Sequence, residues 1–121
     1  MSIMGYSKID KKVEKIIKDV EKYMTGVTPA FIHEQVWNAY IYARDAHEWQ
    51  MRKSGDPYII HPVEATVILL SLQPDLHTIQ ACLLHDVIED TPKTREDIFD
   101  AFGEEVAFLC EGLEKLSSVR Y

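Results

Sequence analysis

Hydrophobic residues recur along this chain at intervals of three and four, which is the spacing of one buried face on an α-helix. In residues 9–24 the apolar positions stand among lysines and acids, and they are Ile9, Val13, Ile16, Ile17, Val20 and Met24. Gly26 ends this segment, and Thr28 with Pro29 offers an N-cap and a first-turn proline for a second helix. We expect that helix to end near Gln50, with an apolar stripe of Val36, Ala39, Tyr40, Ala43 and Ala46.

Two helices are predicted in the middle of the chain, and both carry histidines near their ends. The third spans Val63 to Leu72 and follows Pro62, which leaves His61 at its N-terminal edge. The fourth begins near Leu76 and places His85 and Asp86 towards its C-terminal end, before Thr91-Pro92 stops it. The predicted helix ends therefore bring imidazole and carboxylate groups to the borders of loops.

The last part of the chain predicts two more helices. Thr94 and Asp97 resemble a capping box for a short fifth helix that closes at Gly103. A sixth helix buries Val106, Leu109, Cys110, Leu113 and Leu116. No segment shows the alternation of a strand, and no internal repeat or long linker divides the chain. The pattern predicts an all-α bundle of about six helices in a single domain over residues 1–121.

Composition narrows the classes of function. With 121 residues, 46% of them hydrophobic and 27% charged, the chain fits one globular domain. A formal net charge of −7 argues against nucleic-acid binding, which needs a basic surface, but a small anionic ligand needs only a local group of cations. No apolar run approaches the roughly 20 residues of a membrane span, and the start lacks a secretion signal. Cys82 and Cys110 lie in apolar stretches as packing residues, so we expect a cytoplasmic protein.

The best candidates for a functional site are His61, His85 and Asp86. Two imidazoles and a carboxylate near helix ends suggest a metal site, with His61 approaching from a neighbouring helix. Adjacent residues on a regular helix point about 100 degrees apart, so His85 and Asp86 can share one ion only where their helix meets a cleft. This mixed donor set suits Mn²⁺, Fe²⁺ or a catalytic Zn²⁺ better than a structural zinc site.

Charged residues on either side of this group extend the hypothesis. Glu89 or Asp90 could orient an attacking water or manage its proton, while the ion polarises a phosphoryl oxygen. Arg52 and Lys53 lie on a turn rich in glycine, proline and polar residues, where they could clamp phosphate. Each feature taken alone is better explained structurally, because histidine suits helix C-termini and paired cations usually lie on solvated loops. His47 could reach the basic loop or complete the core, and we favour the core.

Taken together, two motifs resemble the hydrolase domain of the RelA/SpoT homologue family. They are residues 46–62, AHEWQMRKSGDPYIIHP, and residues 83–91, LLHDVIEDT, and the likeness continues through residues 102–107 and 115–116. The resemblance implies an HD-superfamily helical bundle. It further implies an enzyme that removes the 3′-pyrophosphate of (p)ppGpp in the stringent response and uses a manganese ion. The implied products are GDP or GTP and pyrophosphate.

The same resemblance assigns roles residue by residue. It implies that the metal ligands are His61, His85 and Asp86, that the acidic pair linked to hydrolysis is Glu89 and Asp90, and that the nucleotide-contacting loop is Arg52, Lys53 and Ser54. The family's fourth ligand is an aspartate in an Asp-Arg-Leu-His-Asn stretch after the sixth helix, and this chain ends before such a stretch. We therefore expect an N-terminal piece of a longer domain or protein, whose metal site is incomplete.

One position departs from the family pattern, and other functions stay open. Trp49 stands where the family commonly has glycine, beside the basic loop. The alternatives are an HD phosphohydrolase acting on another nucleotide, and a non-catalytic nucleotide-binding or regulatory module. No segment resembles a nucleotide synthetase.

Overall fold

The computed structural model describes residues 5–119, and nearly all of the regular structure in them is helical. The elements are α1 (Ser7–Tyr23), α2 (Pro29–Ala46), α3 (Ile60–Leu69) continued by the 3₁₀ turn η1 (Leu70–Leu72), α4 (Leu76–Leu84), α5 (Val87–Asp90), α6 (Arg95–Phe102) and α7 (Glu104–Val119). Within the described residues the extended pairing is limited to one isolated bridge between Met51 and Pro57. The predicted all-α class is confirmed.

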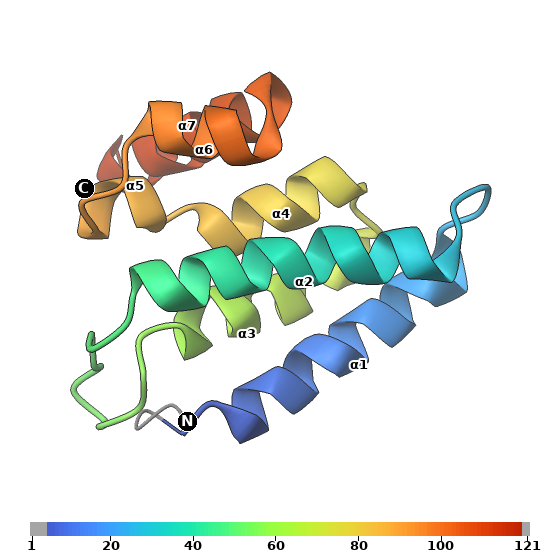
Figure 1. The fold of residues 1–121 in the computed structure, drawn as a ribbon, viewed down its shortest axis with the longest axis horizontal. Coiled ribbons are helices and arrows are strands. Elements are labelled where there is room, and N and C mark those ends of the chain that lie inside the picture. The colour runs from blue at the N-terminus through green and yellow to red at the C-terminus, as the bar shows by residue number, and fades with distance from the viewer. Residues whose placement is uncertain (1–4, 120–121) are drawn as a thin grey trace.

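Helices α2 and α4 pack against each other at the centre of the bundle (Figure 1). Helix α1 lies against α2 and α3 on one side, while α6 and α7 pack together and α7 rests on α4 on the other side (Figure 1). The loop between α2 and α3, the start of α3 and the short α5 all lie at the left end of the view in Figure 1. The topology therefore gathers the segments that carry the predicted site residues at one end of the molecule.

The core is built mainly from the apolar stripes that the sequence pattern predicts, but Leu113, expected to be buried in the last helix, is exposed. Helix α1 buries five of its six predicted positions, namely Ile9, Val13, Ile16, Ile17 and Val20. Burying each such side chain stabilises the fold by roughly 1.5–3 kcal/mol before the entropy cost of ordering it. Tyr40 of α2 is fully buried, and its hydroxyl donates to Asp10 Oδ1 of α1 at 2.5 Å, which joins these helices. Leu116 lies in α7, but its side chain is outside the described part of the structure.

Helix caps explain where several helices begin. The Thr28 hydroxyl accepts a hydrogen bond from the Phe31 amide with Pro29 in the first turn, as expected. Thr94 and Asp97 form the predicted capping box at the start of α6. Asp75 caps α4 through the Thr78 amide. These local signals fix the helix starts independently of the rest of the fold.

Three predicted boundaries near the site differ from the structure. Helix α2 ends at Ala46 and not near Gln50, so Gln50 belongs to the following loop. Helix α3 begins at Ile60, so His61 lies inside its first turn instead of preceding it. Helix α4 ends at Leu84, so His85 and Asp86 lie in a turn, and the acidic residues after them form the separate helix α5. The sequence pattern did not predict this break because apolar spacing continues through Val87 and Ile88.

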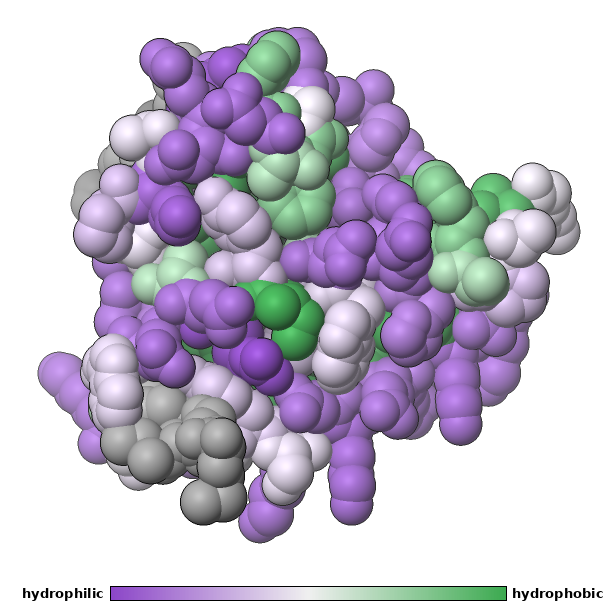
Figure 2. All heavy atoms as spheres, in the orientation of Figure 1, coloured by the Kyte–Doolittle hydropathy of each residue, from purple (hydrophilic) through white to green (hydrophobic). Residues whose placement is uncertain are grey.

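The cysteines are buried, as the sequence predicted, and much of the surface is hydrophilic. Cys82 and Cys110 are both buried and neither is in a disulfide, and burial raises the pKa of the Cys110 thiol to about 12. Figure 2 shows a face that is largely hydrophilic, with hydrophobic side chains gathered mainly near the α1–α2 connection and around α6. Among residues 5–119, no helix combines the length and apolar character needed to cross a bilayer.

Candidate metal centre

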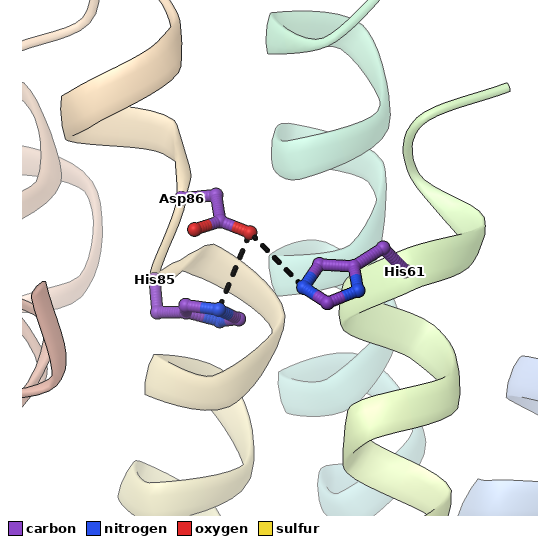
Figure 3. Close-up of side chains that lie close together, drawn as sticks. All are labelled: His61, His85 and Asp86. Atoms are coloured by element: carbon purple, nitrogen blue, oxygen red, sulfur yellow. Dashed lines mark ion pairs between the residues drawn. The ribbon is translucent and has the colours of Figure 1, made fainter. Parts of the chain in front are cut away.

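The turn between α4 and α5 lets two adjacent side chains, His85 and Asp86, point in the same direction. On an unbroken helix His85 and Asp86 would point about 100 degrees apart. Instead the chain leaves α4 after Leu84, and Asp86 adopts φ −90° and ψ −4° before α5 begins. Figure 3 shows the result, in which both side chains point towards His61 on the first turn of α3.

The predicted ligands His61, His85 and Asp86 are brought together. Asp86 Oδ2 lies 3.6 Å from His61 Nε2 and 3.2 Å from His85 Nε2, as the dashed lines in Figure 3 mark. One candidate ligand atom from each residue lies within 4.8 Å of the others. The side chains of His85 and Asp86 are largely buried, at 16% and 12% exposed, while that of His61 is 44% exposed, so the group opens to solvent on the α3 side.

The hydrogen bond between His85 and Cys82 orients the His85 ring to bind a cation. Its Nδ1 lies 2.6 Å from the Cys82 carbonyl oxygen, which can only accept, so Nδ1 carries the proton. In the neutral ring, Nε2 then presents a lone pair towards the carboxylate of Asp86. Two electron-rich atoms this close require a proton or a metal ion between them. The donor set of two imidazole nitrogens and a carboxylate therefore fits a divalent cation such as Mn²⁺, Fe²⁺ or Zn²⁺.

Tyr58 links the metal-ligand candidates to the acidic residues. Its hydroxyl donates to Asp86 Oδ2 at 2.9 Å and lies 3.4 Å from Asp90 Oδ2. Burial, followed by the hydrogen bond to Asp86, raises the pKa of Tyr58 well above its ordinary value. Tyr58 is therefore protonated at neutral pH and acts as the donor between the carboxylates.

The two residues of the predicted acidic pair, Glu89 and Asp90, differ in their contacts. Asp90 is tied to the cluster through Tyr58, and its backbone carbonyl accepts from Gln50 Nε2 at 2.8 Å. Glu89 is exposed, and no hydrogen bond or ion pair joins it to the described residues. Asp90 is thus held near the cluster, while Glu89 is free to reorient.

The predicted nucleotide-contacting residues lie on the exposed loop between α2 and α3. Arg52 Nη1 is 3.8 Å from Glu64 Oε1, and Ser54 Oγ donates to Asp56 Oδ2 at 3.1 Å. Lys53 is exposed, and among the described residues no hydrogen bond or ion pair joins any of these three to His61, His85 or Asp86. The structure therefore leaves the cations available to solvent beside the cluster without placing them in it.

His47 and Gln50 form a layer behind the cluster. His47 is 2% exposed, which agrees with its predicted place in the core, and its ring lies 4.9 Å from that of Tyr58. Gln50 donates through its amide nitrogen to Asp90, so its Oε1 is the atom that faces His47 Nδ1 at 3.1 Å and accepts from it. The contacts of Tyr58 and Gln50 were not predicted, because residues 28 to 40 positions apart make them.

Comparison with known proteins finds a matching family model and several similar proteins. Residues 39–121 match the family model described as HD domain. Over 83 residues the chain is 53% identical to the bifunctional (p)ppGpp synthase/hydrolase SpoT of Escherichia coli strain K12, covering 69% of this chain and 12% of that protein.

Two further relatives carry the name guanosine-3′,5′-bis(diphosphate) 3′-pyrophosphohydrolase. That of Vibrio cholerae serotype O1 is 48% identical over 106 residues, which are 87% of this chain and 14% of the relative. That of Aquifex aeolicus is 38% identical over 121 residues, which are 100% of this chain and 16% of the relative. The chain thus spans between 12% and 16% of the length of these curated relatives.

Proposed function

Because the chain belongs to the HD domain family, and its HD domain is of the RelA/SpoT type, we propose that it is a metal-dependent (p)ppGpp 3′-pyrophosphohydrolase domain. The proposed metal ligands are His61, His85 and Asp86, and the proposed ion is Mn²⁺. The observation that carries the proposal is the approach of these three side chains to within 4.8 Å in a chain with hydrolase relatives.

Each proposed role follows from the chemistry of phosphate-ester hydrolysis. A divalent cation held here would supply a polarised phosphoryl oxygen and an activated water. Asp90 and Glu89 would orient an attacking water and take up its proton as the water attacks the phosphorus bonded to the 3′ oxygen. The phosphorus–oxygen bond breaks, the 3′ oxygen ends with a proton, and the products are pyrophosphate and GDP or GTP.

The α2–α3 loop supplies the proposed contacts to the nucleotide. Arg52 presents a planar fork of donors that fits phosphate, Lys53 adds a point charge, and Ser54 adds a hydroxyl. All three side chains are exposed, which supports access for a ligand. The weak pair between Arg52 and Glu64 is exposed, so opening it costs little.

Within this proposal, residues 1–121 act as one domain in the cytoplasm, and the partner is a guanosine nucleotide, not nucleic acid. The net charge of −7 supports the exclusion of nucleic acid, because general nucleic-acid binding needs a net basic surface.

An assay of pyrophosphate release from guanosine-3′,5′-bis(diphosphate) tests the proposal. We expect release that depends on Mn²⁺, stops on chelation and falls about 100-fold in Asp90→Asn, because the variant loses a group that handles protons. Asp100→Asn on α6, outside the cluster, is the matched control and should keep the wild-type rate. Failure of the metal-loaded protein to release pyrophosphate would contradict the proposed reaction.

A further inference from the structure

The loop between α2 and α3 is a closed unit and not a loose connection. The Tyr58 amide donates to the Gln50 carbonyl at 2.8 Å, and the Arg52 amide donates to the Asp56 carbonyl at 2.8 Å. The bridge between Met51 and Pro57 lies between these bonds. The backbone thus forms a short hairpin-like clip, residues 50–58, with Arg52, Lys53 and Ser54 at its tip.

The base of this clip rests on the candidate metal centre. Tyr58 donates to Asp86, and Gln50 donates to the backbone of Asp90, so both contacts fall on the segment that runs through α5. A helix of four residues has little stability of its own and depends on such tertiary contacts. The clip therefore adds side-chain contacts that hold Asp86 and Asp90, beside the α5 backbone bond in which the Asp90 amide donates to the Asp86 carbonyl at 2.9 Å.

We propose that Tyr58 and Gln50 are positioning residues, which hold the metal ligand Asp86 and the acid Asp90 in place from the loop that also carries the phosphate-binding cations. The inference rests on the proposed function and deepens it. One rigid clip then contacts the nucleotide at its tip and sets the geometry of the metal centre at its base. The Arg52–Asp56 and Gln50–Tyr58 backbone hydrogen bonds connect the tip of the clip to its base.

A buried layer behind the clip supports this function. His47 is packed against the Tyr58 ring and donates to Gln50 Oε1, which orients the Gln50 amide towards Asp90. Without this bond the amide could rotate, and its nitrogen would no longer face the Asp90 carbonyl. The support therefore runs from the core at His47, through Gln50 and Tyr58, to the carboxylates.

The first test is titration of chelator-treated 121-residue chain with Mn²⁺, comparing wild type with Tyr58→Phe. We expect about tenfold weaker metal binding, because loss of a partner that orients a ligand typically weakens affinity by that order. The midpoint of thermal unfolding should change little, because the phenyl ring still packs against His47. Tyr42→Phe is the matched control, since its ring packs on Phe102 away from the cluster, and it should bind Mn²⁺ as wild type does.

The second test needs no metal and so separates this inference from the proposed function. Amide hydrogen exchange of Asp90 and Thr91, whose amides donate within α5, should be faster in Tyr58→Phe and in Gln50→Ala than in wild type or Asn38→Ala. Unchanged exchange in both variants overturns the positioning role, whatever the metal titration shows. Faster exchange in a chain that binds no Mn²⁺ supports the positioning role and contradicts the proposed function.

Discussion

Trp49 shows how one residue can depart from a family pattern at a structural cost. It lies just after α2 with φ at +74°, in the left-handed region that glycine adopts freely and bulky residues avoid. Its side chain is 61% exposed, so burial of the indole compensates for little of the strain. The family's common glycine at this position is therefore explained by the backbone, which must turn sharply from α2 into the clip.

Replacing Trp49 by glycine should raise the free energy of unfolding by about 1 kcal/mol, since relief of left-handed strain exceeds the added freedom of the unfolded chain. Urea denaturation of Trp49→Gly and wild type measures this directly. Glu48→Gly is the matched control, because Glu48 is not in the left-handed region and should lose stability instead. A Trp49→Gly chain less stable than wild type would show that the indole makes a compensating contact.

His47 is a residue whose burial has a consequence for pH. Desolvation lowers its pKa below the ordinary value of 6.5, although the hydrogen bond to Gln50 opposes this. Its Nε2 is buried with no hydrogen-bond partner in the described residues. The neutral ring is therefore the form that the fold accepts, and a proton binds the unfolded chain more readily than the folded one.

A lowered histidine pKa makes stability fall as acid is added. Neutral His47 contributes fully to the free energy of unfolding above pH 6.5, the pKa of histidine in the unfolded chain. This contribution is lost as the pH falls from 6.5 towards the pKa of His47 in the folded chain. We expect the free energy of unfolding of wild type to decrease from about pH 7.5 to about pH 5.5, and to decrease less in His47→Gln. His33→Gln, at an exposed histidine, is the control and should follow wild type. Equal pH dependence in all three chains would refute the assignment to His47.

At the scale of elements, the break between α4 and α5 decides what the site can be. The sequence placed His85 and Asp86 correctly beside His61, yet it predicted them on a helix end, where adjacent side chains diverge. The turn at these residues removes that divergence. Apolar periodicity could not reveal it, because Val87 and Ile88 continue the pattern while the backbone changes direction.

The clip at residues 50–58 predicts separable effects at its tip and its base. Arg52→Ala should weaken binding of a guanosine nucleotide about tenfold, because a charge-assisted contact to phosphate is lost. Mn²⁺ affinity without nucleotide should stay unchanged, since Arg52 contacts none of the candidate ligands. Binding isotherms for the nucleotide and for Mn²⁺ give the two affinities. The control is Arg95→Ala, because Arg95 pairs with Glu104 of α7. Nucleotide affinity equal to wild type would refute the clamp.

At the scale of the whole molecule, local signals predicted the bundle and long-range contacts completed the site. The stripe of α1 and the caps at Thr28 and Thr94 follow from residues close in sequence, so they could be predicted. Tyr58 and Gln50 gain their roles from partners on α5 and the turn before it, which only the packing of α2, α3 and α4 brings near. Tertiary contacts of this kind leave no periodic trace in a single sequence.

The central claim is that His61, His85 and Asp86 form a metal site, and calorimetric titration of the chelator-treated chain with Mn²⁺ tests it most directly. We predict one saturable site in wild type and in the control His33→Ala, and a loss of at least about 100-fold in affinity in His85→Ala with helix content retained. Saturable binding that is unchanged in a folded His85→Ala chain, or no binding in folded wild type, would contradict the account.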